Sequence, residues 1–311
     1  MLYHPPEVGL LSRSSVISAF HLSRWASFTK MNCPDYLVIG HITKDLLDGG
    51  FTVGGTVTYS GLTARNLGRR VGVVTSASSD LDLEEALPGI EVVSVSSSAT
   101  TAFQNIYHNG TRQQFIKAVA ERITAEAIPP HWHHSPIVQL GPLAQELDEE
   151  VAHLFKGSLI GVTPQGWMRQ WDDEGRVSPV VWTAPERVLP FARVLVLSEE
   201  DVGGDMALVQ EYVELTEIVV VTAGWKGSTV YHRGQRRYFP AREVIEVDPT
   251  GAGDVYAAAY LVRLEETGSP WEAAHFANCV ASFSVEQPGV TGIPSRQQVE
   301  ACLLTSYPMD V

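Results

Sequence analysis

The sequence predicts an α/β fold: a doubly wound, mainly parallel sheet flanked by helices, with a small β lid. Short runs of apolar, β-branched residues recur along the chain, and amphipathic helical segments separate them. Strands buried on both faces have continuous apolar sequences, and helices join parallel strands as crossovers. A hairpin signal, His108-Asn109-Gly110, interrupts this alternation and predicts the lid.

The expected strands of the parallel sheet share runs of Val, Ile and Leu bounded by Gly, Pro or Ser. They are the segments 36–39, 71–75, 137–140, 159–162, 194–197 and 218–222. Helices are expected over 59–67, 145–155, 205–215 and 274–286. Ligands of such sheets bind beyond the carboxyl ends of the strands, so we expect the functional residues in the loops that follow them.

The lid is expected to be a hairpin over residues 101–116, because Asn-Gly between two strand-like runs favours a tight turn. Segment 52–58 is expected to add another lid strand. Side chains alternate along a strand, which places Phe103, Asn105 and Tyr107 on one face. That face offers both an apolar platform and hydrogen-bonding groups to a ligand under the lid.

The composition is that of a packed globular protein with an acidic balance. Hydrophobic residues make up 44% of the 311 residues and charged residues 19%. A formal net charge of −14 argues against nucleic acid as a partner. Three widely spaced cysteines form no disulfide or zinc pattern, and no apolar run approaches the ~20 residues that span a bilayer. We expect a cytoplasmic protein with no membrane partner.

Residues 1–30 differ from the rest, since they are rich in serine and contain Glu7 as the only acid. This bias has a weak likeness to an organelle transit peptide. A strand is expected soon after Met31, however, and we therefore favour a non-core extension over 1–30 and a single domain over 31–311.

The most informative motif is segment 248–254, Asp-Pro-Thr-Gly-Ala-Gly-Asp, which directly precedes an apolar helical pattern. Gly251 and Gly253 lack a Cβ, so a ligand can approach the backbone closely. Free amides at a helix N-terminus form an anion site, and Asp254 at its edge can accept a proton from a hydroxyl. These groups suit phosphoryl transfer to an alcohol. The alternative is an ordinary strand-to-helix turn capped by Asp254.

This motif resembles the C-terminal signature of the PfkB, or ribokinase-like, carbohydrate kinase family, Asp-Thr-x-Gly-Ala-Gly-Asp. Pro249 stands where that pattern has Thr, and the five residues that follow it match. The resemblance implies that the amides of Gly251, Ala252 and Gly253 form an anion hole for the transferring phosphate. It also implies that Asp254 is the catalytic base.

The same resemblance implies residues for the acceptor. Asp45 follows the first strand where the family often uses Asp to bind sugar hydroxyls, although a solvated turn residue is the alternative. Gly54 and Gly55 match the N-terminal signature, but Tyr59 replaces the Asn that would contact sugar hydroxyls. The acceptor therefore need not be a furanose, and alternatively Tyr59 packs in the core. Asn105 of the lid is expected to contact the acceptor.

For the phosphoryl donor, the segment after the strand 218–222 resembles the family's Thr-x-Gly-x-x-Gly. This implies nucleotide-binding roles for Thr222, Gly224 and Gly227, although Thr222 could instead cap the strand. Asn278, in a later helical segment, falls where the family lines its adenine pocket.

A metal-linked motif of the family, Asn-x-x-Glu, is replaced here by Ser198-x-x-Asp201. We assign Ser198 to the donor phosphates, and Asp201 and Glu200 to Mg²⁺, which carboxylates usually contact through its waters. The alternative is a helix N-terminus capped by Ser198. Segment 287–294 resembles a closing loop that in many members helps to hold a monovalent cation such as K⁺.

Two other polar features are interpreted as surface groups. The run His131-Trp132-His133-His134 lacks the ligand spacing of a zinc site. Arg169 follows a strand and could meet a phosphate, but nothing in the sequence distinguishes it from a surface arginine.

The resemblance covers about 34–303 and implies an ATP- and Mg²⁺-dependent kinase. Its acceptor would be a hydroxyl of a small sugar, polyol or nucleoside, and the departures at Tyr59 and Ser198 favour an inositol-type polyol. A non-catalytic sugar or nucleotide sensor on the same fold is the alternative from another class. A homodimer formed through the lid is a further hypothesis.

Overall fold

A computed structural model describes Met1, residues 33–108 and residues 111–306. One compact unit begins at Pro34, and the description below concerns that unit. The predicted extension over 1–30 lies outside the described residues apart from Met1, and so does the predicted turn at Asn109-Gly110.

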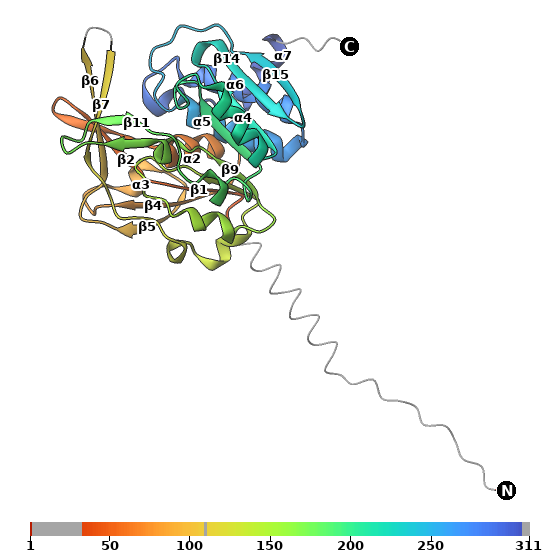
Figure 1. Cartoon of the computed structure of the whole chain (residues 1–311), viewed down its shortest axis with the longest axis horizontal. Helices are drawn as coiled ribbons and strands as arrows, with labels where there is room; N and C mark the ends of the chain where they lie inside the picture. Colours follow the sequence, from red (N-terminus) through yellow and green to blue (C-terminus); the bar gives the residue numbers. More distant parts are fainter. Residues whose placement is uncertain (2–32, 109–110, 307–311) are drawn as a thin grey trace. The chain divides into compact units, whose positions relative to one another are not determined.

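The main sheet has nine strands among the described residues, in the order β15-β14-β13-β12-β9-β8-β1-β4-β5 (Figure 1). The strands from β13 to β5 are parallel, and β14 and β15 add an antiparallel edge. Their bounds are β1 (Tyr36–Ile39), β4 (Val71–Ala77), β5 (Glu91–Ser96), β8 (Ile137–Leu140), β9 (Leu159–Val162), β12 (Val194–Ser198), β13 (Ile218–Thr222), β14 (Gly227–His232) and β15 (Gln235–Pro240).

The fold class and all six predicted strands are confirmed, because their apolar runs are buried on both faces of the sheet. Along β1, Tyr36 and Val38 join one hydrophobic core while Leu37 and Ile39 join the other. The strands β5, β14 and β15 were not predicted. They lie at or near the two ends of the sheet order, where strands are more polar and give a weaker apolar signal.

Helices cover the first of these cores and include the one that begins at the glycine-rich motif. The α-helices are α2 (Thr56–Asn66), α3 (Leu83–Ala86), α4 (Met206–Leu215), α5 (Ala252–Thr267), α6 (Pro270–Ser284) and α7 (Arg296–Ser306). Most of the short 3₁₀ turns contribute to the second hydrophobic core, on the other face of the sheet. The 3₁₀ turns are η1 (Ala125–Ala127), η2 (Pro130–His134), η3 (Glu149–Leu154), η4 (Gln165–Met168), η5 (Pro185–Arg187), η6 (Gly224–Lys226) and η7 (Gly289–Gly292).

The crossover helix predicted over 145–155 is wrong, since only the short turn η3 forms there. Gln145 has a φ of 58°, in the left-handed region, and this conformation interrupts a right-handed helix. Glu146 is buried and accepts hydrogen bonds from the amides of Leu143 and Ala144, which holds the chain in a tight loop instead.

The helix predicted over 205–215 forms as α4, with Asp205 as its cap. The Asp205 carboxylate accepts hydrogen bonds from the amides of Ala207 and Leu208. The alternative that a helix begins at Ser198 is wrong, because residues 199–204 form turns and the helix starts only at Met206.

A separate four-stranded sheet, in the order β3-β2-β6-β7, forms the lid (Figure 1). Its strands are β2 (Thr43–Leu47), β3 (Gly50–Gly54), β6 (Thr101–His108) and β7 (Thr111–Ala118). The predicted hairpin is thus present as β6 and β7. The strand predicted over 52–58 is correct only up to Gly54, because α2 begins at Thr56. A small pair, β10 (Arg169–Trp171) and β11 (Val177–Pro179), lies next to β7.

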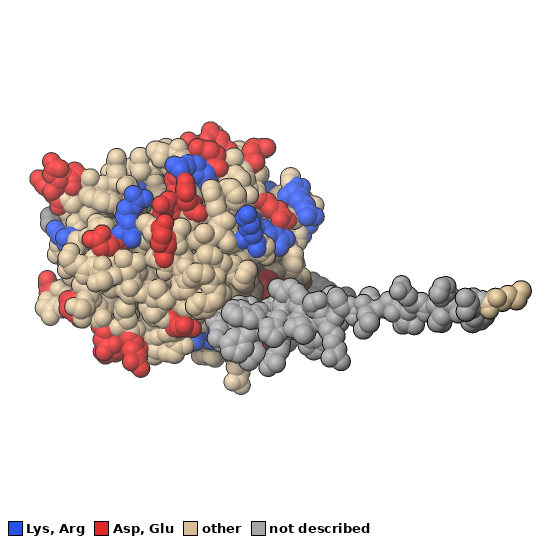
Figure 2. All heavy atoms as spheres, turned by 90° about the horizontal axis from the view of Figure 1, so that it is seen from below, with Lys and Arg blue, Asp and Glu red and all other residues tan. Residues whose placement is uncertain are grey.

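Charged side chains on the face shown in Figure 2 do not form a continuous basic patch, and basic groups lie near acidic ones. This arrangement agrees with the acidic net charge of −14. Within the described part of the chain, every helix is too short or too polar to cross a membrane.

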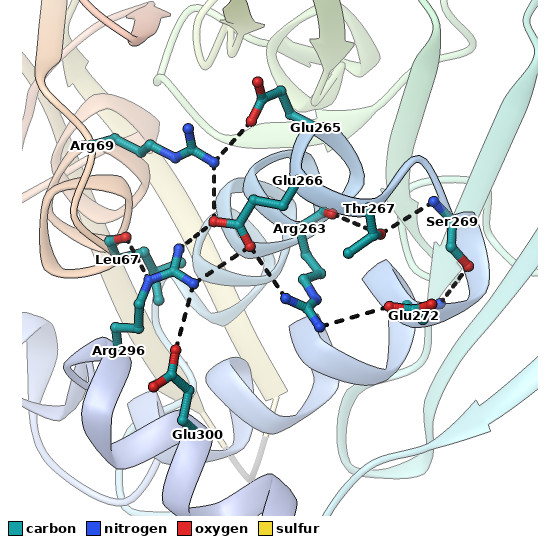
Figure 3. A network of polar contacts seen from close by, with 10 residues as sticks. All are labelled: Leu67, Arg69, Arg263, Glu265, Glu266, Thr267, Ser269, Glu272, Arg296 and Glu300. Carbon is teal, nitrogen blue, oxygen red and sulfur yellow. Dashed lines mark hydrogen bonds and ion pairs between the residues drawn. The ribbon is translucent and has the colours of Figure 1, made fainter.

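An ion-pair network joins the ends of α2 and α5 to the start of α7 (Figure 3). Glu266 accepts hydrogen bonds from Arg69 and Arg296, and Arg296 also donates to the carbonyl of Leu67 at 2.9 Å. Burial raises the pKa of Glu266, but the hydrogen bond and charge of Arg296, with Arg69 and Arg263, outweigh it and lower the pKa overall. The network therefore holds α5 from the end opposite the glycine-rich motif.

Replacing Glu266 with Gln is expected to lower the free energy of unfolding at pH 7 by about 1–3 kcal/mol, because charge-assisted hydrogen bonds are lost. A carboxylate whose pKa is lower in the folded state stabilises the fold above its unfolded pKa. That contribution is lost as the pH falls through the folded value. Urea denaturation at pH 7 and near pH 3 would measure both effects.

Glu265→Gln is the matched control, since the Glu265 side chain is 37% exposed against 22% for Glu266 and pairs with Arg69 alone among the described contacts. A Glu266 variant that is no less stable than this control at pH 7 would contradict the expected role of the network. A destabilisation that persists undiminished at low pH would contradict its electrostatic origin.

Candidate active site

The glycine-rich motif forms the N-terminus of α5 at one edge of the main sheet. Gly251 precedes the helix with a φ of 75°, and a Cβ there would lie 2.3 Å from ring atoms of Tyr59. Glycine is therefore required both by the backbone conformation and by the close approach of the ring. Gly253 is exposed, and a Cβ there would meet no atom within 4 Å, so the backbone is open to a ligand.

Two of the three backbone amides that were predicted to form the anion hole are free to donate a hydrogen bond to a ligand. Within the described residues, the amides of Gly251 and Gly253 have no hydrogen-bond acceptor. The amide of Ala252 instead donates to the carbonyl of Pro249 at 3.2 Å, closing a turn just before the helix. The free amides and the positive end of the helix dipole together favour a bound anion.

Asp254 lies in the first turn of α5, where a carboxylate of raised basicity is held beside the free amides. Burial raises its pKa to about 6, while a hydrogen bond with Thr56 and the charge of Arg169 oppose the shift. The charge of Asp201 adds to the rise. The Asp254 carbonyl accepts a hydrogen bond from Ser60 Oγ at 3.0 Å, so α2 holds both the side chain and the backbone of this residue. A carboxylate with such a pKa can act as a general base near neutral pH.

The predicted acceptor residues gather around the same helix start. A Cβ on Gly54 would lie 2.3 Å from Asp45 Oδ2, so glycine leaves room for that carboxylate on the neighbouring strand. Tyr59 is only 4% exposed and packs on Gly251, which agrees with the core-packing alternative. Burial raises the pKa of Tyr59, and the charges of Asp45, Asp248 and Asp254 raise it further. The ring therefore lies within electrostatic range of both the predicted acceptor residue and the predicted base.

The lid face that was predicted to contact a ligand, that of Phe103, Asn105 and Tyr107, is less open than expected. Phe103 is buried against Ile116 and Leu143 and is not open as a platform for a ligand. Asn105 is partly buried, and its Oδ1 accepts a hydrogen bond from Gln114 Nε2 at 3.2 Å. The side chain of Tyr107 lies outside the described residues.

Arg169 belongs to the site, although its sequence context indicated a surface residue. Its guanidinium lies 5.9 Å from the centre of the Phe103 ring and lowers the pKa of Asp254. The side chain is partly buried at the start of β10, whose pairing with β11 no sequence pattern had predicted. The residue is brought to the base by contacts between segments far apart in the sequence, so a local pattern could not identify it.

All the predicted donor residues except Ser198 line one cavity of about 480 Å³ next to the glycine-rich motif. Thr222, Gly224, Gly227 and Asn278 all contribute to it, together with Gly253. The Thr222 hydroxyl donates to the carbonyl of Leu197 at 3.4 Å, which agrees with the strand-capping alternative. Because Gly253 lines the cavity, a ligand there could extend to the free amides.

The amide of Asn278 is held in place by other groups of the cavity wall. Its Nδ2 donates to Ser228 Oγ at 3.1 Å and to the carbonyl of Phe239 at 3.0 Å. Ser228 in turn shares a hydrogen bond of 2.8 Å with the hydroxyl of Tyr256. The Asn278 side chain is therefore fixed before any ligand binds.

Ser198, assigned to the donor phosphates, and Asp201, assigned to Mg²⁺, are joined in a local turn. The amide and hydroxyl of Ser198 both donate to Asp201 Oδ2 at 2.8 Å, and Glu200 is exposed. In the part of the chain that the structure describes, no group of three His, Cys, Asp or Glu side chains is arranged to bind a metal ion. The histidines of the run 131–134 form no such group either. The assignment of Asp201 and Glu200 to Mg²⁺ stays a prediction, in which the ion would meet them through its waters.

Asp248 braces the loop that carries the motif. Its carboxylate accepts hydrogen bonds from the amides of Thr250 at 3.0 Å and Gly289 at 2.8 Å. Burial raises the pKa of Asp248, but these hydrogen bonds outweigh it and the net shift is downward. The segment 287–294, predicted to close the site, is thereby tied to the motif.

The fold is that of the ribokinase-like kinases, and the predicted anion site, base and donor cavity lie together at the carboxyl edge of its parallel sheet. The model of the pfkB family carbohydrate kinases matches residues 194–296, which include the glycine-rich motif. The chain belongs to this family.

Relatives with assigned activities act on different acceptors. A cytidine kinase of Thermococcus kodakarensis is 27% identical over 256 residues, which are 76% of this chain and 91% of that protein. An inositol 3-kinase of Arabidopsis thaliana is 36% identical over 89 residues, 28% of this chain and 25% of that protein. Family membership thus leaves the acceptor open.

Solved structures share the fold at low sequence identity. A ribokinase of Thermotoga maritima has a TM-score of 0.68 and 23% identity, over 86% of this chain and 99% of that one. A pyrophosphate-dependent kinase of the ribokinase family, complexed with a pyrophosphate analog and myo-inositol, has a TM-score of 0.71 and 24% identity, with the same coverage. At least one kinase with this fold is therefore pyrophosphate-dependent.

Replacing Arg169 with Met is expected to shift the acid limb of the pH dependence of kcat/KM upward from about pH 6. The pKa of Asp254 should rise further, because the guanidinium charge that opposes the effect of burial is removed. Rates from pH 5 to 9 would measure the shift, because the base is active only when ionised.

Arg176→Met is the control, since this exposed arginine lies over Phe115 of the same lid and is absent from the groups that shift the pKa of Asp254. An acid limb that stays in place in the Arg169 variant, or moves equally in both variants, would contradict the electrostatic role of Arg169.

Proposed function

We propose that this kinase transfers the γ-phosphoryl group of ATP to a hydroxyl of a small polyol, sugar or nucleoside, with Asp254 as general base. One observation supports this most: a carboxylate with a pKa of about 6 lies at a helix N-terminus with two free amides. The charges of Asp45 and Asp254 both act on Tyr59, and Gly253 lies in the wall of a cavity of donor size.

The proposed reaction places each proton and charge on a named group of this chain. Asp254 accepts the proton of the acceptor hydroxyl as that oxygen attacks the γ-phosphorus, and Thr56 holds the carboxylate by a hydrogen bond. The bond between the γ-phosphorus and the bridging oxygen to the β-phosphate breaks, and ADP leaves with that oxygen. The amides of Gly251 and Gly253 donate to oxygens of the moving phosphoryl group. Magnesium, when bound, neutralises charge on the donor phosphates. A non-catalytic sensor would need no such base.

The choice of ATP over pyrophosphate rests on the donor cavity. Its volume of about 480 Å³ lies within the 300–1,000 Å³ usual for small-molecule sites and exceeds what a diphosphate needs. Glu243 and Glu246 line it, and the one arginine there, Arg242, is paired with Glu286. This lining suits a neutral base and ribose better than a second polyanion.

The acceptor is proposed to be a polyol of the inositol type or a nucleoside. Asp45 offers a carboxylate that can accept hydrogen bonds from two hydroxyls, which suits a ring that carries several of them. The similarity to both an inositol kinase and a cytidine kinase supports testing these two classes first.

Replacing Asp254 with Asn is expected to lower kcat by roughly 10²–10⁴-fold with little change in the KM of ATP, because Asn cannot accept the proton. The variant should also be more stable than the wild type at pH 8, since burial disfavours the ionised carboxylate in the folded state. Steady-state kinetics and thermal unfolding would measure both.

The assay compares ATP with pyrophosphate as donor and myo-inositol, cytidine, ribose and fructose as acceptors. Asp48→Asn, an exposed lid position, is the matched control and should retain wild-type rates. Near-normal kcat in the Asp254 variant would exclude it as the base. Turnover of the wild type with pyrophosphate but not with ATP would exclude the proposed donor.

A further inference from the structure

A tryptophan stands exposed in the wall of the donor cavity. Trp225 is 81% exposed and lines the cavity from the turn η6, between β13 and β14. The other described tryptophans are buried or partly buried. An exposed indole in the wall of a cavity is costly in water, and large exposed aromatic groups at such sites commonly mark a binding surface.

The exposure of Trp225 is imposed by its loop. Gly224 and Gly227 flank the turn with φ angles of 55° and 114°, both in the region that favours glycine. A Cβ on Gly227 would lie 2.2 Å from the carbonyl of Phe239, so the loop is closely fitted to the neighbouring strand. The amide of Ala223 donates to the carbonyl of Gly227 at 2.8 Å, and the Tyr238 hydroxyl donates to the carbonyl of Lys226. The indole is thus presented by a braced turn.

The rest of the cavity fits a flat, uncharged ring. Val244, Ala281 and Val285 contribute apolar groups, and Asn278 contributes a fixed amide. A nucleobase is planar, has polar edges and stacks on aromatic side chains irrespective of its identity. A pyrophosphate has no such face and would gain nothing from the indole.

We propose that Trp225 is the stacking platform for the base of the nucleotide donor. This inference rests on the proposed nucleotide donor and adds a specific residue to it. Gly253 lines the same cavity, so a nucleotide whose base stacks on Trp225 would direct its phosphates toward the free amides of the motif. Trp225 is then the residue that distinguishes a nucleotide from a bare polyphosphate.

The test compares Trp225→Ala, Trp225→Phe and the control Ile245→Ala in the full chain. Ile245 is equally exposed, at 83%, and lies on the segment next to the cavity without lining it. We expect Trp225→Ala to raise the Kd of ADP and the KM of ATP by roughly 5- to 150-fold, the equivalent of one base stack. Trp225→Phe should recover most of the affinity, and Ile245→Ala should match the wild type.

Two further measurements separate stacking from a general defect. The KM of the acceptor and the inhibition constant of pyrophosphate should be unchanged in Trp225→Ala, because neither ligand contacts the base platform. ADP should quench tryptophan fluorescence in the wild type and much less in Trp225→Phe.

The outcomes distinguish the two proposals. If the wild type uses ATP and Trp225→Ala binds ADP as tightly as the wild type, the platform is overturned while the nucleotide donor stands. If the wild type binds no ADP and turns over only with pyrophosphate, the nucleotide donor and the platform are both overturned. A loss of ADP affinity that Trp225→Phe does not recover would also overturn stacking as the cause.

Discussion

The close packing of α2 on the start of α5 is the constraint on which the rest of the site depends. The Tyr59 ring occupies the space that any side chain at Gly251 would need. Thr56 and Ser60, from the same helix, hydrogen-bond to Asp254. One helix therefore fixes the backbone turn that exposes the amides and the carboxylate beside them. The raised pKa of Asp254 follows, because the same packing removes water from the carboxylate.

This arrangement carries a cost in stability that other parts of the fold offset. An ionised Asp254 at neutral pH is disfavoured in its buried setting, whereas Glu266 at the far end of α5 is ionised and held by several arginines. The two carboxylates on one helix thus have opposite pKa shifts. The helix is anchored at the end where charge is well paired, and the end with the unfavourable buried charge carries the proposed base. Functional sites often keep such local strain while the scaffold supplies the stability.

Much of the fold and the centre of the site could be predicted because their signals are local. The buried strands show continuous apolar runs, and the motif that ends at Asp254 is a single unbroken segment. The failures have a common physical origin. The expected helix over 145–155 is interrupted by the left-handed φ of Gln145. Arg169 lies at the start of β10, over Phe103 of the lid, and its charge lowers the pKa of Asp254. Both depend on tertiary contacts that periodicity does not record.

The phosphoryl donor shows how far a shared fold constrains chemistry. Structures with this fold include a pyrophosphate-dependent kinase, so the fold by itself does not fix the phosphoryl donor. The proposed choice of a nucleotide rests instead on two loops, the braced turn that presents Trp225 and the segment that contributes Glu243 and Glu246. On this proposal, donor choice depends on residues at the cavity wall, whereas the proposed base and the free amides lie at the start of α5.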